Sequence, residues 1–89
     1  MTSRTTKRFR KALQDLPPRI QRQAKQAYEL WRQDPHHSSL KFKRVHPVKP
    51  IYSVRIAIGW RAVGMRNDDA MIWYWVGSHA DYDKLISQL

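Results

Sequence analysis

Two arginines, a histidine and a tyrosine in the C-terminal half of the chain are the residues whose types could do chemistry. Arg55 and Arg61 lie on either side of Gly59, and Tyr82 follows His79 after two intervening residues. A guanidinium group presents a rigid fork of donors that matches phosphate oxygens, and an imidazole accepts or donates a proton near neutral pH. If these side chains converge, they predict a pocket that binds a backbone phosphate and moves a proton.

A second set of basic and polar residues lies just before the first arginine. Lys41, Lys43 and Arg44 have the spacing of side chains that follow a nucleic-acid backbone, and Ser53 is expected on the same strand face as Arg55. We therefore predict that these four residues contact RNA. Lysines that only protect a solvated strand edge have the same pattern, so that alternative stays open.

The charge balance points to polyanionic partners. The chain has 89 residues, with 17 Lys+Arg against 7 Asp+Glu and a formal net charge of +10. This surplus attracts RNA, DNA, anionic lipid or an acidic protein, unless it only keeps a basic surface soluble. The chain has no cysteine, and His36, His37 and His46 lack the spacing of a metal motif. We predict no metal and no cofactor.

Nothing in the sequence predicts a membrane protein. No apolar run approaches the roughly 20 residues of a membrane span. Residues 1–11 are basic and polar, with no apolar segment of a signal peptide behind them. We therefore expect a cytoplasmic protein that has no membrane partner.

The first third of the chain predicts a helical hairpin. Residues 9–16 carry apolar side chains at the spacing of one helix face, after Thr5 and Thr6 as possible N-caps. Pro17 ends this helix because it cannot donate a backbone hydrogen bond. Residues 18–34 carry a second apolar stripe, so two amphipathic helices follow each other closely.

The middle of the chain predicts an antiparallel meander. Residues 52–58, 60–66 and 70–77 read as three strands, and residues 40–45 read as a short extended segment that could add a fourth. Strict alternation in the third strand would place Trp73 on the same face as Trp75, since neighbours on a strand point to opposite faces.

The order of these elements predicts a single α+β domain over residues 1–89. Ser78 and Asp81 fit a capping box that begins a short C-terminal helix. The expected fold is an N-terminal helical hairpin packed on an antiparallel three- to four-stranded sheet, followed by that helix. Because the helices are expected on one face, the face that carries Arg55 is expected to stay open for a ligand.

The chain resembles the RelE/ParE toxin superfamily, nearest to its HigB-like and RelE-like branches. The resemblance covers nearly the whole chain and is carried by the order of elements and by four motifs: Leu16-Pro17, Tyr52-Ser53-Val54-Arg55, Trp60-Arg61-Ala62-Val63 and Trp75-Val76-Gly77-Ser78-His79-Ala80-Asp81-Tyr82. Its most specific part is the series Val-Arg, aromatic-Arg and Gly-x-His-x-x-Tyr.

The resemblance implies the toxin of a type II toxin-antitoxin pair, which enters the ribosomal A site and cuts mRNA with the RNA's own 2'-hydroxyl as nucleophile and without a metal. By position, Arg55 and Arg61 would bind the scissile phosphate, His79 would donate or accept a proton, and Tyr82 would orient or stack. Lys41 and Lys43 would hold ribosomal RNA or the substrate backbone. The implied partners are the ribosome, mRNA and an acidic antitoxin.

The sequence departs from the family pattern at three points. Ser53 stands where RelE-type nucleases often have a lysine, His79 replaces an arginine of part of the family, and no strand is expected before the first helix. Two other functions therefore stay open. The ParE branch shares the fold and is associated with inhibition of DNA gyrase, and a non-catalytic basic RNA-binding module would need only charge and aromatic side chains.

Overall fold

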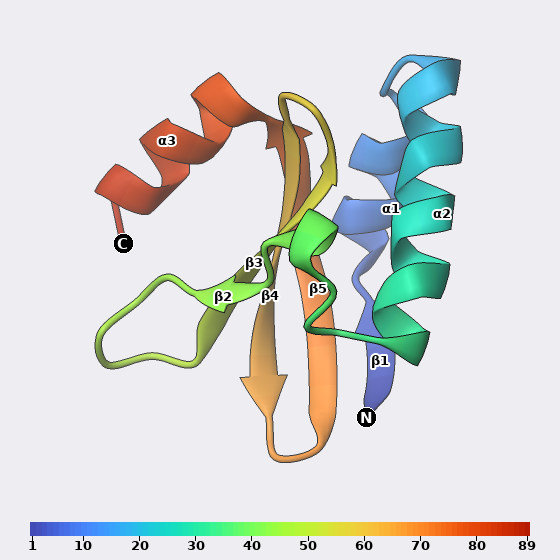
Figure 1. Ribbon diagram of the computed structural model, residues 1–89. Coiled ribbons are helices and arrows are strands. Elements are labelled where there is room, and N and C mark those ends of the chain that lie inside the picture. The colour runs from blue at the N-terminus through green and yellow to red at the C-terminus, as the bar shows by residue number, and fades with distance from the viewer.

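A five-stranded sheet forms the centre of the computed structural model, which describes residues 1–89 (Figure 1). The strands are β1 (Thr2–Thr5), β2 (Lys43–Arg44), β3 (Ile51–Ala57), β4 (Trp60–Asn67) and β5 (Ala70–Ser78). The helices are α1 (Lys7–Gln14), α2 (Pro18–Gln33) and α3 (His79–Ser87), and a short 3-10 turn, η1, covers Ser38–Leu40. The fold class is α+β, as predicted. None of the helices combines the length and the apolar character that a membrane span needs.

The helices begin where capping and proline signals predict them. The Thr6 side chain accepts a hydrogen bond from the backbone N–H of Phe9, so Thr6 caps α1. Pro18 occupies the first turn of α2, where its missing N–H leaves no hydrogen bond unmade. Ser78 caps α3 by accepting a hydrogen bond of 3.2 Å from the N–H of Asp81. The helical hairpin and the C-terminal helix are both confirmed.

The sheet is mixed, with strand order β1-β5-β4-β3-β2. The antiparallel meander of β3, β4 and β5 is confirmed, and β2 adds a short fourth strand. The expectation that no strand precedes the first helix is wrong, because β1 pairs in parallel with β5 from Thr2 opposite Ala70 to Thr5 opposite Trp73. This strand is short and polar and is held by backbone pairing to β5, so no apolar alternation reveals it.

The extended segment predicted at residues 40–45 is limited to two residues. Leu40 ends η1 with its side chain in the core, and Lys41 adopts a left-handed conformation with φ of 46°. Only Lys43 and Arg44 pair with β3. Leu40 and Phe42 both reach the same core, so a turn and not a strand produces the alternating pattern.

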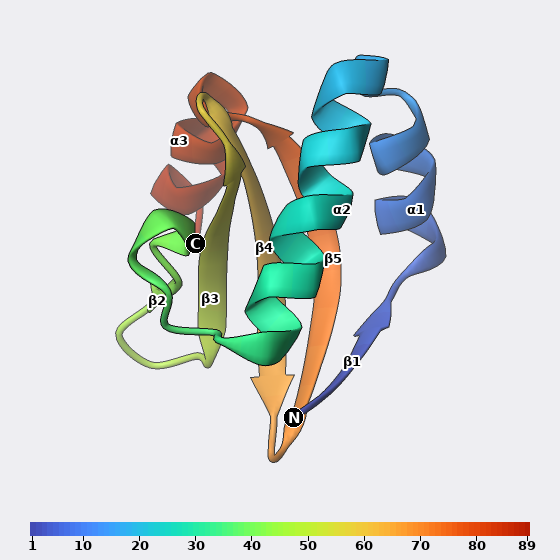
Figure 2. The same cartoon turned by 45° about the vertical axis from the view of Figure 1, so that its right-hand side comes forward.

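The helices cover both faces of the sheet, and the prediction of one open face is wrong. α1 and α2 lie on one face and α3 lies on the opposite face (Figures 1 and 2). The second face carries Ile51, Val63 and Trp75, which pack against α3. These apolar side chains need cover from water, and Tyr82 of α3 supplies part of it.

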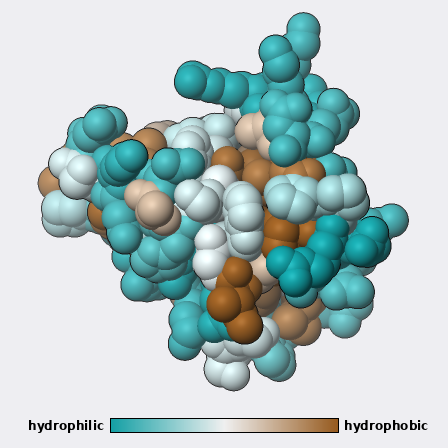
Figure 3. Space-filling model, turned by 90° about the horizontal axis from the view of Figure 1, so that it is seen from above, coloured by the Kyte–Doolittle hydropathy of each residue, from teal (hydrophilic) through white to brown (hydrophobic).

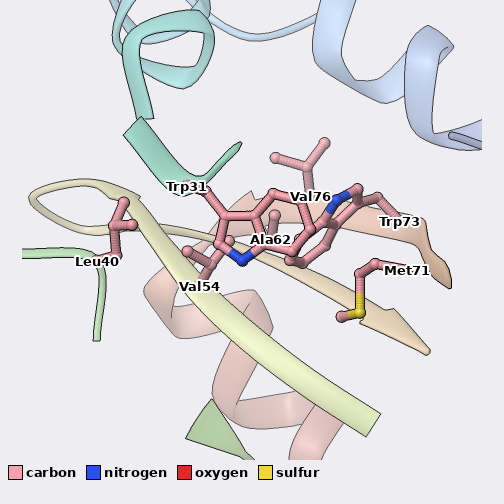
Figure 4. Packing of buried hydrophobic residues seen from close by; sticks show 7 residues of the cluster. All are labelled: Trp31, Leu40, Val54, Ala62, Met71, Trp73 and Val76. Atoms are coloured by element: carbon pink, nitrogen blue, oxygen red, sulfur yellow. The ribbon is translucent and has the colours of Figure 1, made fainter. Parts of the chain in front are cut away.

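The main core lies between the sheet and the helical hairpin (Figure 4). Its buried members come from α2, the turn η1 and the three central strands: Trp31, Leu40, Val54, Ala62, Met71, Trp73 and Val76. The rings of Trp31 and Trp73 meet edge to face with their centroids 5.3 Å apart, a preferred aromatic geometry.

A bulge in β5 overrides the expected alternation of its aromatic residues. Val63 pairs with Trp75 and Gly64 pairs with Trp73, so Tyr74 is an extra residue in β5. Trp73 therefore belongs to the core under α1 and α2, whereas Trp75 packs with α3 on the other face. The prediction that these two tryptophans share a face is wrong for this reason.

We predict that Gly64→Ala destabilises the protein by about 1–3 kcal/mol, because the added methyl group overpacks the sheet. A Cβ at this position would lie 2.8 Å from Cε3 of Trp73 and 2.9 Å from the carbonyl oxygen of Ile72. Urea unfolding measures the effect. Gly59→Asn is the control, because open space around Gly59 excludes overpacking and leaves only the backbone strain at a φ of 81°, which asparagine bears better than most residues. Equal losses in the two variants would contradict the packing argument.

Candidate phosphate-binding site

A cavity of about 320 Å³ lies at the turn between β3 and β4, beside the first residue of α3. Its lining residues come from these two strands, their turn, the start of α3 and the residue that follows η1: Lys41, Arg55, Ala57, Ile58, Gly59, Trp60, Arg61 and His79. Three of the four residues predicted to be catalytic therefore line one cavity. The fourth, Tyr82, is not part of the lining and lies against Arg61 and His79.

The hairpin brings the two arginines together. Arg55 on β3 is directly opposite Arg61 on β4, so both side chains leave the same face of the sheet. Gly59 makes the connecting turn possible with its φ of 81°. The backbone N–H of His79 donates a hydrogen bond of 2.8 Å to the carbonyl of Gly59. This bond joins the start of α3 to the turn and places the imidazole beside the arginines.

Arg61 is buried without a hydrogen-bond acceptor. Its exposed fraction is 8%, and both Nε and Nη1 are buried with no partner. The guanidinium carbon lies 5.2 Å from the centroid of the Tyr82 ring, a cation-π contact. An uncompensated cation in a protein interior is costly, so this group is prepared to bind an anion that enters the cavity.

Tyr82 and Ser53 form a support beneath Arg61. The Tyr82 hydroxyl donates a hydrogen bond of 3.1 Å to Oγ of Ser53, and both residues are buried. The predicted contact of Ser53 with RNA does not fit its exposed fraction of 0%. The structure gives Ser53 an internal partner instead, because α3 covers the sheet face that the sequence analysis left open. Tyr82 thus contacts Arg61 with its ring and Ser53 with its hydroxyl.

His79 is exposed and held from two sides. Its Nδ1 lies 3.3 Å from Oδ2 of Asp83, one helical turn further along α3, and its ring meets that of Tyr82 edge to face. A proton on Nδ1 that faces Asp83 leaves Nε2 as the nitrogen that is available to a ligand. Sequence reasoning missed the role of Asp83, although the spacing of four residues on a helix was its signal.

The charged side chains that line the cavity are all positive. Lys41, Arg55 and Arg61 contribute positive charge, and no acidic residue belongs to the lining. No group of three or more His, Cys, Asp or Glu side chains is placed to hold a metal ion. Burial raises the pKa of Tyr74 above its usual value of 10.0, but Tyr74 lies outside this cavity.

The residues predicted to contact RNA are separated by the structure. Lys41 lines the cavity, whereas Lys43 is exposed and does not. Arg44 is exposed, but its guanidinium group donates hydrogen bonds to the carbonyls of His46, at 3.0 Å, and Val48, at 2.7 Å. Arg44 therefore organises the loop before β3 and has fewer donors free for a phosphate.

A second, larger cavity of about 530 Å³ lies between the N-terminal helices and the sheet. Its lining is mostly apolar, and it includes Phe9, Tyr28 and Trp31 from α1 and α2. Seen from above in Figure 3, hydrophilic side chains cover much of the surface and hydrophobic atoms are visible between them. Arg4 and Lys25 also line this larger cavity, but Arg55, Arg61 and His79 all belong to the smaller one.

Comparisons with known proteins agree on the fold. The family model of the ParE-like toxin domain matches residues 18–84, which is most of the chain. No curated protein matches the sequence. The other similarities are to solved structures.

Three solved structures illustrate these similarities. The chain is 20% identical to a chain of the RelB-RelE antitoxin-toxin complex from Methanococcus jannaschii, with a TM-score of 0.72 over 91% of this chain and 95% of that one. The chain is 14% identical to YafQ from Escherichia coli strain BL21(DE3), with a TM-score of 0.71 over 90% of this chain and 94% of that one. It is 18% identical to the isolated Escherichia coli RelE toxin, with a TM-score of 0.64 over 99% of this chain and 98% of that one. The expected RelE-like fold is confirmed.

The buried hydrogen bond between Tyr82 and Ser53 should stabilise the docked α3. We predict that Tyr82→Phe and Ser53→Ala each lower the free energy of unfolding by about 1 kcal/mol, because each leaves one buried hydroxyl unpaired. The double variant should lose less than the sum, with a coupling energy of about 1 kcal/mol in urea unfolding. Strictly additive losses would show that the two hydroxyls do not interact.

Proposed function

The chain belongs to the ParE-like toxin domain family, and so to the RelE/ParE toxin superfamily, and we propose that it is the toxin of a type II toxin-antitoxin pair that cleaves mRNA on the ribosome. The observation that carries the proposal is the buried guanidinium group of Arg61, which has no acceptor and lines a cavity with other cations. A phosphodiester supplies the missing acceptor oxygens in a geometry that fits this group.

The second arginine supports the choice of a phosphate over other anions. Arg55 and Arg61 are directly opposite each other, so two guanidinium forks approach one cavity from neighbouring strands. The non-bridging oxygens of a phosphodiester bear the charge that grows during attack on phosphorus. Donors fixed beside that charge stabilise the transition state more than the ground state.

The chemistry we propose needs no metal. The 2'-oxygen of the RNA attacks the adjacent phosphorus, the bond from phosphorus to the 5'-oxygen breaks, and the products are a 2',3'-cyclic phosphate and a 5'-hydroxyl. One proton leaves the 2'-hydroxyl and one reaches the 5'-oxygen. Nε2 of His79 is available for one of these transfers, since Nδ1 faces Asp83. Arg55 and Arg61 hold the phosphate and stay charged throughout.

The partners we propose are the ribosome with its mRNA, in the cytoplasm, and an acidic antitoxin. The net charge of +10 favours all of these polyanionic or acidic partners. Solved structures of similar fold from Methanococcus jannaschii and Pyrococcus horikoshii OT3 are toxins bound to an antitoxin. The larger cavity also suits a protein partner, because most of its lining residues are apolar.

Inhibition of DNA gyrase is the second candidate function. The family model that matches residues 18–84 is the ParE-like one, and the ParE branch is the one that the sequence analysis associated with gyrase. The non-catalytic RNA-binding module is a third candidate, for which charge and aromatic side chains suffice. The cationic cavity beside an imidazole favours cleavage over both.

We predict that Arg61→Ala lowers the rate of mRNA cleavage on translating ribosomes by about a hundredfold to a thousandfold, and His79→Ala by at least about a hundredfold. Mapping of RNA 5' ends and a single-turnover assay measure these rates, and thermal unfolding checks that each variant folds. Arg66→Ala is the matched control, since Arg66 lies on the same strand as Arg61 and outside the cavity. Cleavage at the wild-type rate by both site variants would refute the assigned roles.

A DNA supercoiling assay with purified protein and no ribosomes separates the two toxin functions. The proposed nuclease leaves gyrase activity unchanged in this assay. A loss of supercoiling with intact messages would instead support the gyrase inhibitor. Binding of RNA that weakens with salt and never leads to cleavage would support the binding module.

A further inference from the structure

Lys41 lies on the cavity that holds the two arginines, and we propose that it is a further catalytic residue whose ammonium group contacts the reacting phosphate. This inference rests on the proposed ribonuclease function and deepens it. It also changes the role predicted from the sequence, in which Lys41 and Lys43 follow the RNA backbone together. The structure separates the two lysines, because Lys41 lines the cavity and Lys43 does not.

The backbone holds Lys41 in an unusual conformation. Its φ of 46° and ψ of 41° lie in the left-handed region, which costs energy for a residue with a side chain. Its neighbours are fixed, since Leu40 is buried in the core and the Phe42 ring stacks on Tyr52 with centroids 5.1 Å apart. Glycine would adopt this conformation without strain, so a strained lysine at the edge of a cationic cavity points to a use for its amine.

The charge of Lys41 has no partner within the protein. The only ion pair in the chain joins His79 to Asp83, and no carboxylate belongs to the lining of the cavity. Lys41, Arg55 and Arg61 therefore repel one another when the cavity holds no anion. A phosphate placed among them removes this repulsion, and Lys41 adds to its binding from the side of η1.

The chemistry of an ammonium group complements that of the two guanidinium groups. An ammonium is a compact charge with three donors, so it follows the charge that grows on a non-bridging oxygen as the 2'-oxygen bonds to phosphorus and the 5'-oxygen leaves. In this role Lys41 donates hydrogen bonds and transfers no proton. Ser53, which stands where RelE-type nucleases often have a lysine, has an uncharged hydroxyl and is buried, so it cannot take this role.

The test compares Lys41→Gln with Lys43→Gln, because the two residues have the same charge and are both exposed. We expect Lys41→Gln to lower the single-turnover cleavage rate on ribosomes by about a hundredfold. Lys43→Gln should change the rate less than about twofold, because Lys43 lies outside the cavity. Equal losses in the two variants would overturn the proposal and leave both lysines as general contacts to polyanions.

Lys41→Gly separates catalysis from folding. Its melting temperature should equal or exceed that of the wild type, because glycine accepts the positive φ, while its cleavage rate should fall as far as that of Lys41→Gln. A lowered melting temperature with an unchanged rate would overturn the proposal.

A binding measurement keeps this inference distinct from the ribonuclease proposal. If the wild-type protein cleaves no RNA, the ribonuclease proposal is refuted. The affinity for an uncleavable 2'-deoxy dinucleotide then tests whether Lys41 belongs to the anion site. Calorimetry should then show a loss of about tenfold for Lys41→Gln and less than about twofold for Lys43→Gln. Equal affinities in the two variants would exclude Lys41 from the anion site.

Discussion

The buried guanidinium group of Arg61 is the constraint on which the site depends. Removing such a cation from water costs several kcal/mol when no acceptor replaces the lost hydration. The contact with the Tyr82 ring offsets only about 1–2 kcal/mol of this cost. The free energy that holds Arg61 in place must therefore come from the docking of α3, whose Tyr82 also bonds to Ser53. An anion bound in the cavity would supply the hydrogen-bond acceptors that Arg61 lacks in the folded protein.

Local pattern was enough to predict most of the fold, and non-local pairing decided the rest. The two N-terminal helices follow from apolar periodicity and from Pro17 and Pro18, and the meander follows from alternation between turn residues. The strand β1 (residues 2–5) has no pattern of its own and exists because the edge of β5 accepts it. The extra residue Tyr74 is equally invisible, since a bulge depends on the register with the partner strand.

The same distinction applies to the site. A hairpin that turns at Gly59 places Arg55 opposite Arg61, and this juxtaposition is readable from the sequence because it depends on neighbouring strands alone. The internal partner of Ser53 and the place of Lys41 on the cavity are not readable in that way. The first depends on which sheet face α3 covers, and the second on one left-handed residue that redirects the chain. Both are properties of the folded molecule and have no signature in residue type or spacing.

The charge distribution indicates that this fold gives up stability for binding. None of the 17 Lys and Arg side chains forms an ion pair, because the one contact between oppositely charged residue types joins His79 to Asp83. Such a surplus destabilises the compact state by self-repulsion, most strongly where cations converge on one cavity. The large apolar core around Trp31 and Trp73 lies on the opposite face of the sheet from α3, and it meets the site through Leu40 and Phe42, the neighbours of Lys41. The core on one face of the sheet can therefore offset the repulsion between cations on the α3 face. A polyanionic ligand that binds there reduces this repulsion and stabilises the folded protein.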